Sequence, residues 1–216
     1  MGGKICNELL QKYIDSVGQK IARVSHRPDV NYHFTAINHK TINAFAMPGG
    51  YVFVTKGMLE KLDSESQLAG VLSHEITHVV ARHSAEAISR QTGLQMILIT
   101  AAASTGSPGA AQAADAARQI IGLQYSKEDE RQADLTGMNY MVTAGYDPNG
   151  MVETMQMLQH EEQSGPIDFL SSHPSSYSRI AYLSQRIETR YSGLKGLKVG
   201  KEDYHREVLA RLAKVP

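Results

Sequence analysis

The sequence is poor in the features that mark several large classes of protein. Its one cysteine, Cys6, excludes an internal disulfide and a thiolate cluster that holds a metal ion. Its 22 basic and 22 acidic residues give a formal net charge of +0, so no basic domain or stripe predicts nucleic-acid binding. We therefore expect no nucleic acid among the partners, and any metal ligands must be histidine, aspartate or glutamate.

Long hydrophobic runs are also missing from the sequence. The longest apolar run, Leu94 to Ala103, contains Gln95 and Thr100 and has about half of the roughly 20 residues that a membrane-spanning helix needs. Met1 to Cys6 lead into a polar, helix-like stretch, so we expect no signal peptide in this chain. Residues 92–124, which surround the apolar run, are a candidate for peripheral contact with a membrane or a partner protein.

The hydrophobic pattern predicts a mainly helical chain. With 216 residues, of which 42% are hydrophobic, we expect one domain over residues 1–216, with its core at about 7–191 and a helical appendage at 192–216. Apolar positions at helical spacing predict a first helix over residues 7–26. Further helices are predicted over residues 92–103, 113–124, 126–145, 149–162, 175–191 and 201–212, with a flexible loop at 104–114.

Three short stretches after the first helix change to the periodicity of strands. Residues 32–36 alternate between apolar and polar, residues 43–47 are short, and residues 51–55 are rich in aromatic and β-branched side chains. A Pro-Gly-Gly turn at residues 48–50 separates the last two. The sequence therefore predicts an α+β fold with a small antiparallel sheet of about three strands.

The next predicted helix carries the most informative motif of the chain. It begins near Ser64, where Ser64 and Gln67 form a capping box, and it contains H-E-x-x-H at residues 74–78. Imidazoles at i and i+4 project from one helix face and can bind the same metal ion. Glu75 then lies beside the open metal position, where it can take a proton from water. The alternative, an exposed helix with two histidines that bind nothing, is disfavoured by the apolar residues around the motif.

Catalytic zinc takes three protein ligands, so the two histidines require one more group. Metzincins extend the motif to a third histidine, but Ala81 and Ser84 occupy the glycine and histidine places here, which excludes that class. Glu130 and Asp134 lie at i and i+4 on a later predicted helix, and Gly137 on the same face lets another helix come close. This spacing favours Glu130 as a ligand and Asp134 as a carboxylate that accepts the free N–H of a zinc-bound histidine.

A competing explanation is that these acids only favour the start of their helix. Acidic side chains in a first helical turn are stabilised by the helix dipole. We prefer that explanation for Glu128 and Asp129, but not for Glu130. We interpret His83, which lies five positions after His78 and off the ligand face, as a structural or surface residue.

These motifs together resemble the gluzincin metallopeptidases that include the CAAX prenyl proteases, the heat-shock membrane proteases and the periplasmic and mitochondrial quality-control proteases. The resemblance covers most of residues 7–190 and implies a mainly helical, zincin-like α+β domain, with its sheet beside the H-E-x-x-H helix. It implies that His74, His78 and Glu130 bind one zinc ion and that Glu75 and Asp134 form the catalytic pair. The segments that carry it are 43–45, 48–50, 74–83, 130–134, 144–148, 172–174 and 179–180.

The resemblance also narrows the expected role. Membrane members of the family carry spanning segments, and none is predicted here, so the chain resembles the soluble or peripheral envelope branch. We expect a zinc endopeptidase that cleaves unfolded or misassembled proteins in the bacterial cell envelope, in the periplasm or at a membrane. The alternative is a zinc-stabilised, chaperone-like module that holds unfolded protein without cleaving it.

Two further groups of residues are candidates for the site. We predict that His173 faces the zinc and that Arg179 reaches either the substrate or the groups behind the ligands. One of them can stabilise the oxyanion of the tetrahedral intermediate, or His173 can occupy the open zinc position and hold the enzyme inactive. We also predict that an exposed strand edge pairs with an extended substrate peptide, or holds it in the chaperone-like alternative. The residues of this edge are Gly50, Tyr51, Val52 and Phe53.

Overall fold

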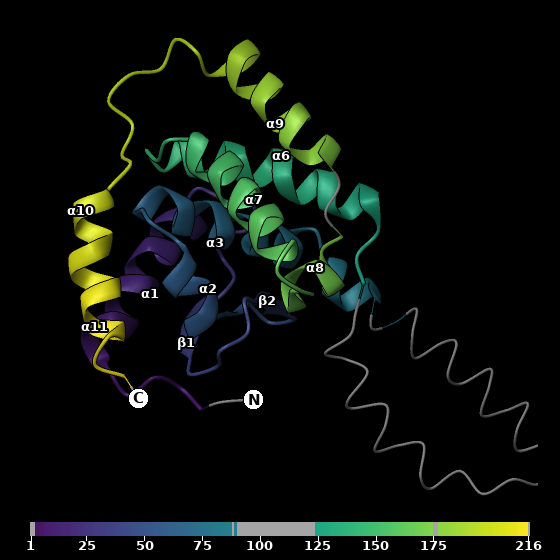
Figure 1. Cartoon of the computed structure of the whole chain (residues 1–216). Helices are drawn as coiled ribbons and strands as arrows, with labels where there is room; N and C mark the ends of the chain where they lie inside the picture. The colour runs from purple at the N-terminus through teal and green to yellow at the C-terminus, as the bar shows by residue number, and fades with distance from the viewer. Residues whose placement is uncertain (1–2, 88, 90–123, 175–176, 216) are drawn as a thin grey trace, which may run out of the picture.

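The computed structural model describes residues 3–87, 89, 124–174 and 177–215. Figure 1 shows the order of the elements along the chain. The predicted helices over 92–103 and 113–124, the predicted loop at 104–114 and the candidate contact region at 92–124 lie outside the described residues, except for residue 124. The elements are α1 (Glu8–Ala22), β1 (His33–Ile37), β2 (Ala44–Met47), β3 (Tyr51–Thr55), α2 (Lys56–Lys61), α3 (Glu65–Val80), α6 (Lys127–Thr143), α7 (Asn149–Glu162), α8 (Asp168–Ser172), α9 (Tyr177–Arg190), α10 (Lys201–Tyr204), η2 (His205–Leu209) and α11 (Ala210–Leu212).

The mainly helical α+β fold with a three-stranded sheet is confirmed, but the sheet is mixed. Its strand order is β1-β3-β2, with β2 antiparallel and β1 parallel to β3. The prediction of a fully antiparallel sheet is therefore wrong for β1. The reason lies in residues 38–43, which carry the chain from the end of β1 past the position of β3. The tight turn at residues 48–50 then returns β3 into the space between the other two strands.

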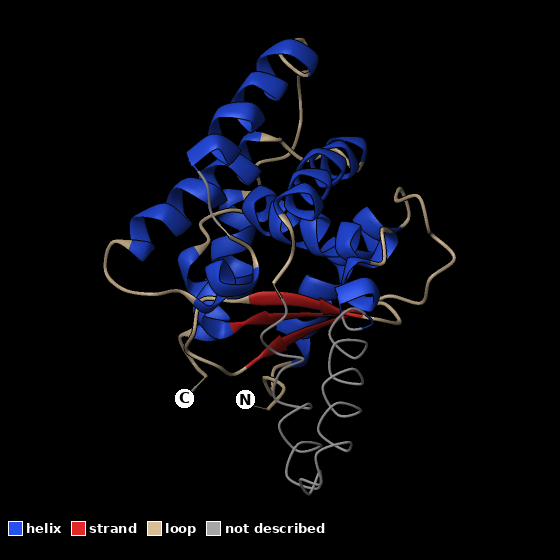
Figure 2. Cartoon of the chain, turned by 90° about the vertical axis from the view of Figure 1, so that its right-hand side faces the viewer, coloured by secondary structure: helices blue, strands red, loops and turns tan. Residues whose placement is uncertain are grey.

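One face of the sheet packs against the hydrophobic core. Alternate residues of the three strands, such as Phe34, Val52 and Val54, are buried, whereas Tyr51 and Met47 on the opposite face are exposed. Most of the helices lie on one side of the sheet in Figure 2. The alternation of apolar and polar residues that predicted these strands thus reflects a sheet with one covered face.

Helix α3 is the central element, and almost its whole length is buried. Half of the predicted capping box is present, because Ser64 accepts a hydrogen bond from the amide of Gln67 at 3.2 Å. The side chain of Gln67 accepts from the amide of Asp63 at 2.6 Å instead of from that of Ser64. Helix α6 packs along α3 and begins with a reciprocal capping box between Ser126 and Asp129. A Cβ atom at Gly137 of α6 would lie 3.0 Å from the backbone of α3. Glycine there permits the close approach that places side chains of the two helices in one site.

The C-terminal segment packs into the same core as the preceding elements. Tyr204, Val208 and Leu212 are buried and belong to the hydrophobic cluster that contains α1 and α3 residues. The hydroxyl of Tyr204 donates to the carbonyl of Leu59 at 2.7 Å. The predicted helix over 201–212 is present as α10, η2 and α11 in succession. Within the described ranges, no helix is both long and apolar enough to cross a membrane.

Candidate active site

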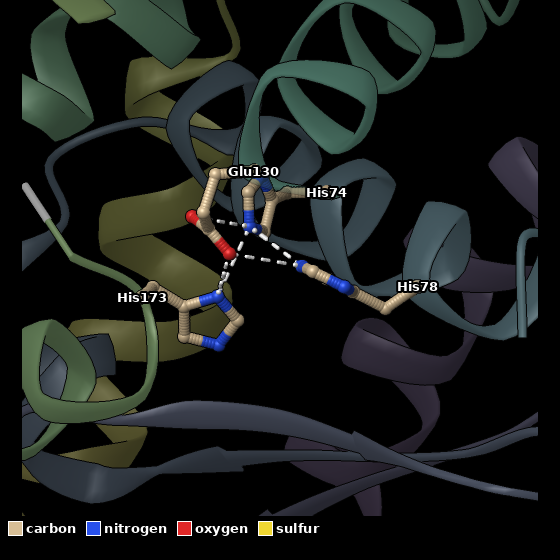
Figure 3. Close-up of side chains that lie close together, drawn as sticks. All are labelled: His74, His78, Glu130 and His173. Carbon is tan, nitrogen blue, oxygen red and sulfur yellow. Dashed lines mark hydrogen bonds and ion pairs between the residues drawn. The ribbon is translucent and has the colours of Figure 1, made fainter. Parts of the chain in front are cut away.

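Four side chains from separate parts of the chain meet at one buried point (Figure 3). His74 and His78 come from α3, Glu130 from the first turn of α6, and His173 from the residue that follows α8. Their candidate ligand atoms all lie within 4.8 Å of one another. The structure thus brings together the three residues predicted as ligands and adds His173 to them.

The atoms that face one another in this cluster are lone-pair donors. Nε2 of His78 lies 3.1 Å from Nε2 of His74 and 3.4 Å from Oε1 of Glu130. Nδ1 of His173 lies 2.9 Å from the same carboxylate oxygen and 3.3 Å from Nε2 of His74. Imidazole nitrogens and a carboxylate oxygen at these separations form a donor set that suits a divalent metal ion.

Unpaired buried polar atoms beside the cluster support the same conclusion. Both carboxylate oxygens of Glu75 and Nε2 of His173 are buried without a hydrogen-bond partner among the described residues. Glu75 Oε1 lies 3.6 Å from that nitrogen. A buried carboxylate that lacks partners is costly, so this arrangement fits a site whose remaining partners are a cation and a water or substrate.

Burial sets the protonation chemistry of the cluster. It raises the pKa of the Glu75 carboxyl above its ordinary value, which makes this residue a better proton acceptor when it is ionised. Burial also holds the pKa of His78 well below its ordinary value, so its imidazole is neutral and keeps a lone pair. Burial alone would raise the pKa of Glu130, but the neighbouring His173 and His74 hold that pKa well below the ordinary range. Glu130 is therefore a carboxylate, as a metal ligand must be.

Asp134 lies behind His74, as the spacing from Glu130 predicted. Its Oδ1 accepts from Nδ1 of His74 at 3.0 Å, which directs the lone pair on Nε2 toward the cluster. The guanidinium of Arg179 binds the same carboxylate through Nε at 2.8 Å and Nη2 at 2.7 Å. The hydroxyl of Tyr182 also donates to it. Asp134 thus orients a histidine and does not itself face the open side of the cluster.

Arg179 binds two of the acids of α6, Asp134 and Glu130. Besides its two bonds to Asp134, it donates from Nη1 to Oε2 of Glu130 at 2.6 Å, and the side chain is buried on α9. The sequence left two positions open for Arg179, beside the substrate or behind the proposed ligands. In the structure it lies behind the proposed ligands. A guanidinium held by two carboxylates is not available to an oxyanion, which leaves His173 as the candidate for that role.

The surface interpretation of His83 is wrong, because this residue is buried against the site. Helix α3 ends at Val80, and Arg82 adopts a left-handed conformation with φ of 62°. The chain reverses there and brings Nδ1 of His83 to 3.0 Å from Nδ1 of His78. The helical spacing from which the prediction was made no longer applies after residue 80.

Two tyrosines of the site were missed in the sequence. Tyr125 stacks on the ring of His78, with centroids 3.9 Å apart, and its hydroxyl lies 2.8 Å from Oγ of Ser84. No motif marks Tyr125, which directly precedes the cap of α6. Tyr182 does have a signal, because it follows Arg179 by three residues on a helix and so shares its face.

The predicted substrate-binding edge is wrong, because β3 lies between β1 and β2. Gly50, Tyr51, Val52 and Phe53 therefore offer no free backbone edge to a substrate or to a chaperone client. The strand next to the cluster is β2, where the hydroxyl of Ser84 donates to the carbonyl of Ala46 at 3.1 Å. The physical reason is again the parallel pairing of β1 with β3, which cannot be predicted from the local sequence of either strand.

Comparisons with known proteins agree with this geometry. The model of the family described as peptidase family M48 matches residues 8–187. The β-barrel assembly-enhancing protease of Escherichia coli (strain K12) is 32% identical over 188 residues, which cover 82% of this chain and 39% of that protein. The mitochondrial metalloendopeptidase OMA1 of Schizosaccharomyces pombe is 36% identical over 175 residues, 80% of this chain and 52% of that protein. Metalloprotease YcaL of E. coli is 26% identical over 181 residues, 79% of this chain and 70% of that protein. The chain thus spans about two fifths to one half of the length of the first two relatives.

Replacement of Arg179 tests how far the buried acids depend on it. In Arg179→Leu, Asp134 and Glu130 keep their buried positions but lose their common cation, so we expect a loss of about 3–5 kcal/mol in the free energy of unfolding. Urea unfolding measures this. Arg211→Leu, which breaks the more exposed pair with Glu207, serves as the control and should cost far less. Equal losses in the two variants would contradict the assigned role of Arg179.

Proposed function

The chain belongs to peptidase family M48. On that premise we propose that it is a metalloprotease, and specifically a zinc-dependent endopeptidase of unfolded or misassembled proteins. The observation that carries the proposal is the meeting of His74, His78 and Glu130 beside the unpartnered carboxylate of Glu75. Two imidazoles and a carboxylate are the ligand set of catalytic zinc in other metallopeptidases.

In this proposal His74, His78 and Glu130 hold the zinc ion. When bound, zinc polarises the scissile carbonyl and lowers the pKa of the attacking water to about 7. Glu75 accepts a proton from that water and then delivers it to the leaving amine. Asp134 keeps the Nδ1 proton on His74, and Arg179 balances the charges of Asp134 and Glu130.

The names of the relatives support the proposed substrates and location. One relative is named for the assembly of β-barrels, and such barrels are characteristic of outer membranes. We therefore place this protein in the bacterial cell envelope, in the periplasm or at a membrane, with protein or peptide substrates. One metallopeptidase domain over residues 1–216 is part of the proposal, and the burial of the C-terminal helices in the common core supports it.

The decisive variant is Glu75→Gln. It removes the proton acceptor but leaves the three proposed ligands, so we expect casein cleavage to fall roughly 10²–10⁴-fold while one zinc ion per chain is retained. Cleavage and zinc content are measured on the same preparation. The control is Glu128→Gln, the same substitution at an exposed glutamate of α6. Full cleavage by Glu75→Gln, or a wild type without zinc, would contradict the proposal.

The side of β2 that faces away from β3 is the proposed place for the substrate backbone. The amide of Thr55 donates to the carbonyl of Asn43 at 3.0 Å. Since antiparallel partners alternate in their hydrogen bonding, Phe45 then pairs with β3, whereas Ala44 and Ala46 direct their peptide groups away from it. The backbone of Ala46 is near enough to Glu75 to act on its pKa. An extended peptide added to this edge would thus pass the proton acceptor.

Hydrogen exchange tests this edge. In the Glu75→Gln variant, which is proposed to bind without cleaving, a casein-derived peptide should slow the exchange of the Ala46 amide, since Ala44 is already fully buried. The amide of Thr35 in β1, on the far side of the sheet, should not change. Unchanged exchange at Ala46 under saturating peptide would show that substrates bind elsewhere.

We further propose that His173 acts as a fourth ligand in a resting state. Its Nδ1 lies among the other ligand atoms, and its ring stacks on Phe169 with centroids 4.4 Å apart, inside the buried site. A histidine in this position fills the place that a substrate carbonyl needs. In the other role, Nε2 of His173, which has no hydrogen-bond partner among the described residues, would donate to the oxyanion.

The His173→Ala variant distinguishes the two roles. An inhibitory ligand predicts a several-fold increase in casein cleavage, because the open position is freed for substrate. An oxyanion donor predicts a decrease of about 10²–10³-fold in kcat instead. Zinc content is measured in parallel, since both roles leave His74, His78 and Glu130 in place.

A further inference from the structure

The two ligand histidines of α3 are held from behind in different ways. His74 donates from Nδ1 to the carboxylate of Asp134. Among the residues that the structure describes, no acid contacts Nδ1 of His78; this nitrogen lies 3.0 Å from Nδ1 of His83 instead. Two ring nitrogens at that distance share one proton. Which ring carries this proton decides whether Nε2 of His78 keeps a lone pair for the proposed zinc ion.

The surroundings of His83 decide where the proton lies. Nε2 of His83 lies 3.1 Å from Oε1 of Gln132 and 3.6 Å from Oδ1 of Asp129. Both neighbours are acceptor oxygens, so a neutral His83 carries its proton on Nε2. Its Nδ1 is then an acceptor, and the shared proton belongs to Nδ1 of His78. Nε2 of His78 is left with a lone pair, and this is the atom that faces the ligand cluster.

We propose that His83 is a positioning residue that fixes the tautomer and ring orientation of His78 through the series Gln132, His83, His78. Gln132 accepts from His83, His83 accepts from His78, and His78 offers Nε2 to the metal ion. This inference rests on the proposed zinc site. It adds to that site two residues that do not contact the metal ion.

The fold holds His83 in this position from several sides. The backbone reverses at the end of α3 through the left-handed conformation of Arg82. Residues other than glycine rarely adopt this conformation. His83 is buried, and the ring of Tyr125 stacks on the ring of His78, with centroids 3.9 Å apart. Strained backbone that persists next to a functional site is typical of a residue held for function.

The different partners also give the two ligands different electrostatic surroundings. The partner of His74 is a carboxylate that Arg179 compensates. The partner of His78 is an imidazole whose Nε2 lies 3.1 Å from the amide oxygen of Gln132 and 3.6 Å from the carboxylate of Asp129, so the group that contacts His78 itself bears no negative charge. Outer partners of metal-bound histidines commonly change metal affinity by about 10–100-fold when they are removed.

Zinc affinity of variants at position 83 tests the proposal. His83→Phe keeps a buried ring but removes the acceptor, so competition with a chelator should show roughly 10–100-fold weaker zinc binding. His83→Asn places an amide oxygen near the position of Nδ1 and should restore most of the affinity. His160→Phe, at an exposed position of α7, is the control. Wild-type affinity in His83→Phe, or equal losses in the Phe and Asn variants at equal thermal stability, would overturn the proposal.

The proton positions are tested directly by nitrogen-15 NMR of the zinc-loaded, full-length chain. Long-range proton–nitrogen correlations should show His78 protonated at Nδ1 and His83 at Nε2. A proton on Nδ1 of His83 would overturn the proposed series, whatever the activity. A wild type that binds no zinc or cleaves no casein would instead contradict the proposed function, so the two failures are distinguishable.

Discussion

The site depends on one interaction, the buried guanidinium of Arg179 between Asp134 and Glu130. Three carboxylates, these two and Glu75, lie in a region from which water is largely excluded. A buried charge is tolerated only when it is paired and hydrogen-bonded. Arg179 binds Asp134 with two bonds and Glu130 with a third. Of the three acids, Glu75 is the one without a hydrogen-bond partner among the described residues, as its proposed role of proton acceptor requires.

That arrangement requires α3, α6 and α9 to meet closely. Gly137 allows α6 to approach α3 at the turn that carries His74, and the i, i+4 spacing on α6 then presents Glu130 and Asp134 to the same histidine pair. Helix α9 supplies Arg179 from a distant part of the sequence. Packing and chemistry are therefore inseparable here, because the residues that close the core also set the charges of the site.

The sequence predicted the parts of the site that follow from local periodicity. His74 and His78 are four residues apart on α3, and Glu130 and Asp134 are four residues apart on α6. A regular helix places residues at that spacing on one face. The features that the sequence did not predict lie where regular secondary structure ends or where distant segments pair. His83 follows a left-handed Arg82, a conformation more typical of glycine or asparagine, and the place of β3 in the sheet depends on a parallel partner from an earlier segment.

The sheet error has a consequence for how substrates are expected to bind. Both β2 and β3 alternate in the same way, so the pattern of side chains cannot distinguish an outer strand from a central one. The distinction comes from hydrogen bonding, which leaves the outward peptide groups of Ala44 and Ala46 without a strand partner in the described sheet. The carbonyl of Ala46 accepts from Ser84, Ser84 contacts the hydroxyl of Tyr125, and Tyr125 stacks on His78. Three successive contacts thus connect the outer strand with one of the proposed metal ligands. A peptide that pairs with β2 would therefore act on the same group of side chains that positions His78.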